Sequence, residues 1–278
     1  MHPKVEVIDG IFCYAPDLAR ENEGFPAESF KYLFALEEAN FWFRARNRVL
    51  QNFFSKYVSN EKAKVLEVGC GTGVVMQHLH KKFPSLDFTG SEIHLEGLKF
   101  AKRRMPEINF VQLDATRMPF SCEFDVVGAY DVVEHIADDE LVLSQVHSAL
   151  KTKGYFFVTV PQYQWMWSVA DEIAFHKRRY TKKELTQKLQ KAGFEIDYMG
   201  SFMFVLFPMM LLSRILQGKK KVNELTTEEI EHFNIAELKL PKFVNRVFEI
   251  LTEIDVFLIK TGFSLPFGGS LVAVAHKK

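Results

Sequence analysis

The sequence predicts an α/β protein with a doubly wound, mostly parallel sheet, and three observations support that prediction. From residue 63 onward, short β-rich runs alternate with amphipathic stretches, as they do in βαβ units. Gly69, Gly71 and Gly73 follow the first of these runs, and acidic residues stand where the next runs end. Together these features predict a Rossmann-like sheet that holds a nucleotide-like ligand at the carboxyl ends of its strands.

The elements follow from periodicity and from helix signals. The aromatic-rich segment 25–60 carries apolar residues three and four apart, which predicts helices. Another helix is expected to begin at Thr181, because Thr181 and Glu184 match a capping box. Strands rich in Val and Phe are expected at 63–69, 86–92, 108–114, 124–130, 155–161, 194–200 and 270–277, with helices at 74–83, 95–105 and 139–151.

This order of elements predicts three parts. Residues 1–60 are expected to form an N-terminal helical cover, and 61–200 together with 262–278 a Rossmann-like cofactor-binding core. Residues 201–261 are expected to form an apolar, helical insertion before the last strand. Its most apolar stretch, 202–216, is shorter than the roughly 20 residues that a membrane span needs.

Composition excludes several classes of protein. The chain has 278 residues with 35 Lys+Arg against 35 Asp+Glu, so a protein that mainly coats nucleic acid is not expected. Cys13, Cys70 and Cys122 lie far apart and show no metal-ligand spacing, which argues against a disulfide framework and a zinc site. The N-terminus lacks the basic start and apolar run of a signal peptide. A cytoplasmic location is therefore expected, with membrane association as a further option.

The glycine loop, residues 65–73, lets the backbone turn tightly and approach a ligand. The dinucleotide fingerprint needs glycine at position 74, where Val74 stands, and no Lys-Ser or Lys-Thr follows as in a phosphate loop. Both NAD and nucleoside triphosphates are therefore disfavoured, although a nucleotide-dependent oxidoreductase stays an alternative.

Acids mark the ends of the following strands. Glu92 ends the second, Asp114 ends the third and Asp131 follows the fourth, so their carboxylates are expected to face one crevice. A carboxylate there can accept both hydroxyls of a ribose, and one on the next strand end can accept an adenine amino group.

This constellation resembles the class I S-adenosylmethionine-dependent methyltransferases over about residues 40–200 and the last strand. EVGCGTG is similar to the family's first motif, and FDVVGAYDVVEHI followed by LKTKGYFFVTVP is similar to later motifs of the small-molecule branch that includes the ubiquinone-biosynthesis methyltransferases. The resemblance implies S-adenosyl-L-methionine as cofactor, with Glu92 at the ribose and Asp114 at the adenine. The cofactor-binding residues that we expect are Glu67, Gly69, Cys70, Gly71, Gly73, Glu92, Ile93, Asp114, Ala115, Tyr130, Trp42 and Arg46.

The last two of these residues come from the segment FWFRARN. Related enzymes often carry an aromatic-Trp-aromatic run and an arginine that cover the cofactor, which implies that Arg46 pairs with the methionine carboxylate. The alternative is that Phe41, Trp42 and Phe43 are core residues of a helical cap and that Arg46 lies on the surface.

Methyl transfer is an in-line displacement, so the protein must mainly hold the acceptor atom about 3–3.5 Å from the methyl carbon. A base is needed if that atom belongs to a hydroxyl, and oxygen, nitrogen and carbon acceptors all stay open. His135, Asp131 and His176 are the candidate catalytic residues by their place after the fourth and fifth strands. A structural hydrogen bond is the alternative for His135, and a solvated loop position is the alternative for His176.

No metal is expected. His78 and His80 are two residues apart on a predicted helix and point to different faces. The acidic run at 138–140 is explained by a helix N-terminus, which favours acids through capping and the helix dipole.

The acceptor is expected to be a small apolar or amphiphilic molecule such as a lipid. The basic loop 176–183 lies beside aromatic residues at 163–167 and the apolar run 202–216, which together predict an apolar pocket with a basic rim and peripheral membrane contact. A solvated helix start and a helical subdomain core are the alternatives for these segments. A cofactor-binding or membrane-associated module without turnover is the alternative function.

Overall fold

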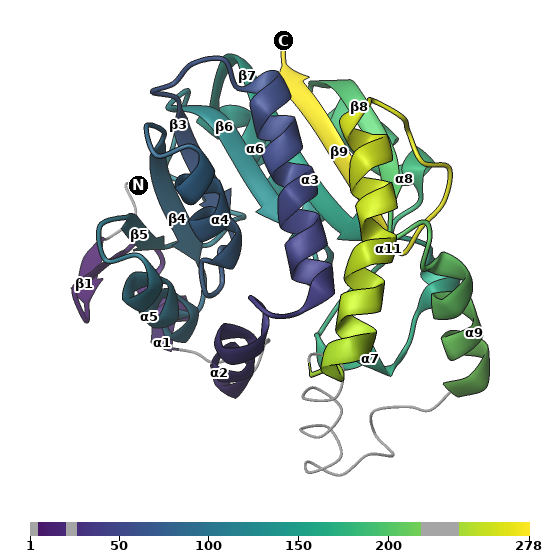
Figure 1. The fold of residues 1–278 in the computed structure, drawn as a ribbon. Helices are drawn as coiled ribbons and strands as arrows, with labels where there is room; N and C mark the ends of the chain where they lie inside the picture. The colour runs from purple at the N-terminus through teal and green to yellow at the C-terminus, as the bar shows by residue number, and fades with distance from the viewer. Residues whose placement is uncertain (1–4, 21–26, 218–238) are drawn as a thin grey trace.

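A computed structural model describes residues 5–20, 27–217 and 239–278 (Figure 1). Its strands are β1 (Glu6–Ile8), β2 (Ile11–Cys13), β3 (Lys64–Val68), β4 (Asp87–Glu92), β5 (Asn109–Gln112), β6 (Phe124–Tyr130), β7 (Leu150–Pro161), β8 (Phe194–Phe202) and β9 (Ser270–Lys277). Its helices are α1 (Pro16–Arg20), α2 (Ala27–Leu36), α3 (Phe41–Tyr57), α4 (Val74–Lys82), α5 (Leu95–Arg104), α6 (Asp139–Ala149), α7 (Val169–Ile173), α8 (Lys182–Lys191), α9 (Phe207–Gln217) and α11 (Lys242–Lys260), with 3-10 turns η1 (Val133–His135) and η2 (Gln164–Met166).

The strands form a single sheet in the order β1-β2-β5-β4-β3-β6-β7-β9-β8. From β5 to β7 all neighbours are parallel, while β9 runs antiparallel between β7 and β8. The seven strands expected from the sequence are confirmed. From β3 the chain builds β4 and β5 on one side, and it then returns to the other side of β3 to form β6. The strand order therefore reverses between β3 and β6, and ligands of such sheets bind at this reversal.

Strand alternation builds a core on each face of the sheet. Val65 and Val126 contribute to one cluster, together with side chains of α3, α4, α5 and α11. Their neighbours Leu66 and Val127 contribute to the other, together with α6 and α8. Successive side chains of a strand point to opposite faces, so these runs of consecutive apolar residues are buried on both sides. The result is a three-layer arrangement, with helices on both faces of the sheet (Figure 1).

The N-terminal region contains two strands that the sequence analysis does not expect. β1 and β2 form a hairpin whose second strand pairs parallel with β5, Phe12 opposite Val111. The turn residues Asp9 and Gly10 have φ angles of 51° and 76°. An Asp-Gly pair between apolar runs favours such a turn, and this is the signal that the helical interpretation of residues 1–60 missed. The division into cover, core and insertion stays a prediction, and residues 218–238 of the insertion lie outside the described residues.

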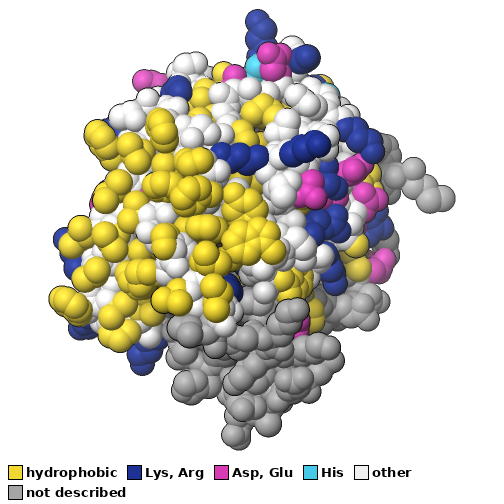
Figure 2. All heavy atoms as spheres, turned by 90° about the vertical axis from the view of Figure 1, so that its right-hand side faces the viewer, with side chains coloured by type: hydrophobic (Ala, Val, Ile, Leu, Met, Phe, Trp, Pro, Cys, Tyr) yellow, Lys and Arg dark blue, Asp and Glu magenta, His cyan; other side chains and the backbone are white. Residues whose placement is uncertain are grey.

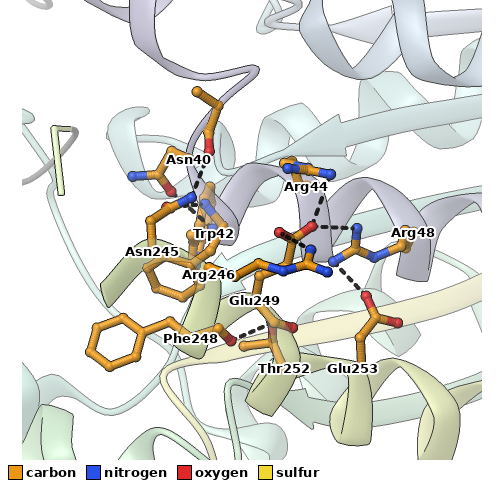
Figure 3. A network of polar contacts seen from close by, with 12 residues as sticks. Asn40, Trp42, Arg44, Arg48, Asn245, Arg246, Phe248, Glu249, Thr252 and Glu253 are labelled. Atoms are coloured by element: carbon orange, nitrogen blue, oxygen red, sulfur yellow. Dashed lines mark hydrogen bonds and ion pairs between the residues drawn. The ribbon is translucent and has the colours of Figure 1, made fainter. Parts of the chain in front are cut away.

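The insertion helix α11 is tied to α3 by a polar network (Figure 3). Buried Glu249 accepts hydrogen bonds or ion pairs from Arg44 at 2.9 Å, Arg48 at 3.2 Å and Arg246 at 3.1 Å. Asn245 accepts from the Phe41 backbone N–H at 2.9 Å, so α11 also holds the first residue of α3. These contacts tie the two helices together although they lie far apart in the sequence, with the paired positions 201 and 204 residues apart.

The apolar stretch 202–216 divides between core and surface. Phe202 and Leu206 are buried in the sheet-side core, whereas Met209, Leu212 and Ile215 on α9 are exposed. Among the described residues, no helix combines the length and the apolar character needed to cross a membrane.

A second buried ion pair, between Arg104 and Glu37, contacts the glycine loop at Thr72. The Arg104 guanidinium donates to the Glu37 carboxylate at 2.7 Å and to the Thr72 carbonyl at 3.0 Å, and both charged side chains are almost fully buried. The Thr72 hydroxyl donates to the same Glu37 oxygen at 2.5 Å. This network joins α5, the residue after α2 and the loop between β3 and α4.

Replacing Arg104 by Met is expected to lower the free energy of unfolding by about 3–5 kcal/mol, because it leaves the Glu37 carboxylate buried without its partner. Urea denaturation at pH 7 measures this loss. The neighbouring Arg103→Met change serves as control and should cost less than about 1 kcal/mol, since its side chain only lies over Phe34 at the surface. Equal losses in the two variants would contradict the assignment.

Candidate cofactor and acceptor site

The glycine loop leaves β3 and enters α4 in left-handed conformations, with φ angles of 67° at Gly69, 52° at Gly71 and 79° at Gly73. Residues other than glycine rarely adopt these φ angles. A Cβ at Gly69 would lie 2.5 Å from Cγ2 of Val132, so the loop is packed directly against the segment that follows β6. Cys70 in this loop is buried, and burial raises the pKa of its thiol well above the ordinary value, which agrees with a packing role.

Glu92 at the end of β4 is nearly buried and faces this loop. One carboxylate oxygen accepts from the Gly71 N–H at 3.1 Å, and the other accepts from the N–H groups of Ile93 at 2.8 Å and His94 at 3.1 Å. His94 caps α5, so the acid also lies at the positive end of a helix dipole. The structure thus places Glu92 beside the glycine loop, as a ribose-binding acid would require.

Asp114 follows β5, the next strand of the sheet. It accepts from the Thr116 backbone and hydroxyl at 2.9 and 2.7 Å, and from Arg117 at 2.7 Å. Partial burial raises its pKa, but these hydrogen bonds outweigh it and leave the pKa below the ordinary value. Ala115, its neighbour, is buried. Asp114 is therefore a charged acid at the strand end next to Glu92.

Arg46 brings the helical cover to the crevice. Its side chain is buried, and Nη1 donates to Asp131 Oδ2 at 2.7 Å. The guanidinium carbon lies 4.7 Å from the ring centroid of Trp42 and 5.3 Å from that of Phe43. The alternative of a surface position for Arg46 is therefore wrong. Asp131 also accepts from the Thr159 hydroxyl at 3.0 Å, which links the ends of β6 and β7 to α3.

Arg46 Nε, Glu67 Oε2 and the Tyr130 hydroxyl lie buried around this ion pair and have no hydrogen-bond partner among the residues that the structure describes. Burial, assisted by the charges of Glu37 and Glu92, raises the pKa of Glu67 to about 8 against the opposing charge of Arg46. Buried polar atoms are normally hydrogen-bonded, so this cluster fits a polar, charged ligand group such as the amino-acid end of S-adenosylmethionine. The residues present fit the cofactor that the resemblance implies.

The two candidate histidines lie together on the β6 and β7 side of the crevice. The ring of His135 in η1 meets the ring of His176 edge to face, with centroids 4.6 Å apart. His176 Nδ1 lies 2.9 Å from Asp171 Oδ1, and its side chain is only 16% exposed, so the solvated loop position is wrong. Burial and the neighbouring His176 lower the pKa of His135 to about 3, which keeps this imidazole neutral.

Asp171 is a residue that the sequence analysis missed. Burial raises its pKa, but hydrogen bonds and charge from His176 and Arg179 outweigh burial and hold it at about 2. Asp171 thus stays charged and orients His176. An Asp and a His five residues apart in an irregular stretch is a weak signal, which explains why the pair went unnoticed.

Glu134 completes this cluster. Its carboxyl is fully buried and has no hydrogen-bond partner within the described part of the chain, and Oε1 lies 3.9 Å from His176 Nε2. Ligand atoms of Glu134, His135 and His176 all lie within 4.8 Å of one another, a grouping that can hold a metal ion. The sequence analysis did not find this group because the loop that carries His176 is distant in the chain. Its expectation of no metal stays a prediction.

The basic loop 176–183 has less free charge than the sequence suggests. Arg178 pairs with buried Asp139 at 2.8 Å, and Arg179 pairs with Asp171 at 2.7 Å. Lys177 and Lys183 remain exposed. Much of the loop's positive charge is therefore used inside the protein.

An aromatic cluster joins the end of β7 to α9. Tyr163 stacks on Trp165 with centroids 5.2 Å apart, and Phe207 lies 6.0 Å from Tyr163 and 5.4 Å from Phe267. Trp165 is 59% exposed, whereas Met166 beside it is fully buried. The aromatic surface expected near 163–167 is thus present on the outer side of the crevice.

Comparison with known proteins identifies the family. A model described as a methyltransferase domain matches residues 36–198. The chain belongs to this methyltransferase family. A probable S-adenosylmethionine-dependent methyltransferase of Mycolicibacterium smegmatis is 28% identical over 174 residues, which cover 60% of this chain and 65% of that protein. A fatty-acid O-methyltransferase of the same organism is 33% identical over 119 residues, 40% of this chain and 43% of the relative.

The chain spans less than two thirds of the length of these curated relatives. Among solved structures, phosphoethanolamine N-methyltransferase 2 of Haemonchus contortus in complex with S-adenosyl-L-methionine matches with a TM-score of 0.54 at 18% identity, covering 82% of this chain and 52% of that chain. The YcgJ protein of Bacillus subtilis gives 0.54 at 15% identity, covering 83% and 98%. These likenesses confirm the fold.

The match to a relative named as a probable S-adenosylmethionine-dependent methyltransferase supports the expected cofactor, and the oxidoreductase alternative is not favoured. Membership in the ubiquinone-biosynthesis branch stays a prediction.

The raised pKa of Glu67 predicts a pH dependence of stability. Because its pKa is about 8 in the folded protein and 4.5 ordinarily, the folded state binds more protons between these values, and this carboxyl's contribution to stability falls as pH rises through that window. Glu67→Gln removes the ionisation, so its free energy of unfolding should fall less between pH 5.5 and pH 8.5 in cofactor-free urea titrations. Glu96→Gln on the surface of α5 is the control. A Glu67→Gln protein with the wild-type slope would exclude this assignment.

Proposed function

We propose that this methyltransferase moves a methyl group to a small amphiphilic acceptor that enters between the end of β7 and α9. The observation that supports it best is the aromatic cluster of Tyr163, Trp165 and Phe207 beside the crevice. Relatives named as a fatty-acid O-methyltransferase and as phthiotriol/phenolphthiotriol dimycocerosates methyltransferases of Mycobacterium tuberculosis are consistent with an acceptor that carries a large apolar part. The methylated atom, oxygen, nitrogen or carbon, is left open.

The cofactor contributes an electrophilic methyl group on a sulfonium. In our proposal the backbone at Gly69, Gly71 and Gly73 lets it approach β3, and Glu92 accepts hydrogen bonds from its ribose. Asp114, with Ala115 and Ile93 nearby, lies on the adenine side. The glycine loop, Glu92 and Asp114 follow the neighbouring strands β3, β4 and β5. The sheet therefore sets the distances between the groups that we propose contact the cofactor.

The partnerless polar atoms belong to the amino-acid end of the site. Arg46 offers a positive charge to a carboxylate, and Glu67, whose raised pKa keeps it largely protonated at neutral pH, offers a carboxyl that a nearby ammonium group would help to ionise. Tyr130 adds a hydroxyl, and Trp42 stacks on Arg46 and keeps water from the guanidinium. Asp131 is best understood as a positioning residue, because Arg46 and Thr159 both bind its carboxylate.

His176 is the base that we propose for an acceptor whose proton must be removed. Asp171 fixes Nδ1, which leaves Nε2 directed toward Glu134 and His135. A carboxylate that orients a histidine in this way also stabilises the imidazolium formed when the base takes a proton. His135 stays neutral and packs against this ring.

Glu92→Ala is expected to weaken S-adenosylmethionine binding by about 1–3 kcal/mol, because the ribose loses a charge-assisted acceptor. Calorimetric titration with S-adenosylmethionine, run in parallel with NADH, measures the change. Glu96→Ala, four residues away on the exposed side of α5, should bind like the wild type. Unchanged affinity in Glu92→Ala would remove Glu92 from the cofactor site, and binding of NADH alone would refute the proposal.

His176→Ala is expected to lower kcat at least about 100-fold with a hydroxyl acceptor and to leave S-adenosylmethionine affinity unchanged, because a base acts only on the acceptor. Transfer of labelled methyl to alkyl-substituted phenols measures the rate. His276→Ala is a matched control, since His276 also pairs with an aspartate, Asp197 at 2.7 Å, near the other end of β7. An unchanged kcat in His176→Ala would assign the residue a structural role.

A further inference from the structure

The insertion presents an apolar face to solvent. On α11 the exposed side chains Phe243, Ile250, Ile254 and Phe257 follow one another at helical spacing, and Leu212 and Ile215 on α9 are exposed as well. We call these six residues the apolar face. Phe243 is 80% exposed and Phe257 is 64% exposed. Figure 2 shows hydrophobic side chains gathered over a broad area of this side of the molecule, with Lys and Arg side chains around its margin.

The inner side of α11 is already occupied. Glu249, Thr252, Val256 and Ile259 are buried against the rest of the protein. A surface helix normally turns polar residues outward once its inner stripe is packed. The outer stripe therefore adds nothing to the core of this chain and leaves large apolar surface in water, which is typical of a surface that contacts another phase or molecule.

The charges of α11 indicate what covers the face. Each of its acids has a partner: buried Glu249 pairs with three arginines, half-exposed Glu253 pairs with Arg48 at 2.6 Å, and Asp255 accepts from the backbone N–H groups of residues 204 and 205. Lys242 and Lys260 at the two ends of the helix are exposed, and among the described residues they take part in no ion pair. The solvent side of α11 thus combines aromatic and aliphatic side chains with free positive charge.

We propose that the apolar face docks this enzyme on a lipid bilayer that carries anionic headgroups. Phe and Ile side chains enter the boundary between headgroups and acyl chains, while the lysines bind lipid phosphates, as in helices that lie in the plane of a membrane interface. This refines the membrane contact expected from 202–216 and 176–183: part of the first segment is core, and the arginines of the second are paired internally.

The position of the face suits the supply of an amphiphilic acceptor, and this step rests on the proposed function. Phe267 contacts both Phe204 and Phe207, with centroids 4.7 and 5.4 Å away, and Phe207 continues to Trp165 beside the crevice. Aromatic rings therefore extend from the α9 side to the end of β7. An acceptor that leaves the bilayer there keeps its apolar part in contact with protein.

Co-sedimentation of the full chain with vesicles tests the docking without any acceptor. The wild type should bind vesicles of phosphatidylcholine with phosphatidylglycerol and bind phosphatidylcholine alone much more weakly. Phe257→Asp should weaken binding at least about tenfold, and Lys242→Glu and Lys260→Glu about fivefold or more each. Phe12→Asp on β2 is the matched control, a phenylalanine of 54% exposure outside the face, and should bind like the wild type.

Calorimetric titration with S-adenosylmethionine separates this proposal from the proposed function. Each variant should keep wild-type cofactor affinity, which also shows that it folds. Absent vesicle binding by a wild type that binds the cofactor would overturn the docking alone. Equal binding to both vesicle types, or wild-type binding by Phe257→Asp, would do the same. A dimer in light scattering that Phe257→Asp dissociates would assign the face to a second copy of the chain instead.

Discussion

The ion pair between Arg46 and Asp131 connects the helical cover to the carboxyl edge of the sheet, and much of the site depends on it. Arg46 comes from α3, whereas Asp131 follows β6 in a left-handed conformation with φ of 57°. A buried guanidinium requires a partner, so the helix must lie where the strand end can reach it. The same guanidinium lies over the ring of Trp42. Its charge also acts on Glu67, whose pKa is raised because this part of the site is buried.

The sheet and the cofactor loop were predictable because local rules determine them. Strands such as β6 and β7 are apolar on both faces, and the glycines between β3 and α4 are needed for positive φ angles whatever surrounds them. The positions of Glu92 and Asp114 next to each other were predictable because the carboxyl ends of parallel strands lie along one edge of a sheet. The periodicity of apolar residues and the glycine loop were therefore enough to predict the sheet and the positions of Glu92 and Asp114 at its edge.

Other features depend on contacts between distant parts of the chain, which a single sequence does not show. The approach of His176 to Glu134 and His135 arises only because the segment after β7 folds back over η1. The burial of Arg104 against Glu37 likewise needs α2 and α5 to meet. The β1–β2 hairpin is different, since Asp9-Gly10 between two short apolar runs is a local turn signal that the helical interpretation of residues 1–60 overlooked.

The polar network between α11 and α3 links the outer surface of α11 to the helix that carries Arg46 and Trp42. Glu249 binds Arg44 and Arg48, which lie two residues on either side of Arg46, and Asn245 holds the backbone at Phe41, so α11 is tied directly to the helix that carries Trp42. Thermodynamic reciprocity then applies: if an occupant of the outer helix surface changes cofactor affinity by some factor, cofactor changes the affinity for that occupant by the same factor. With such a coupling, release of the spent cofactor and release of that occupant would be linked events.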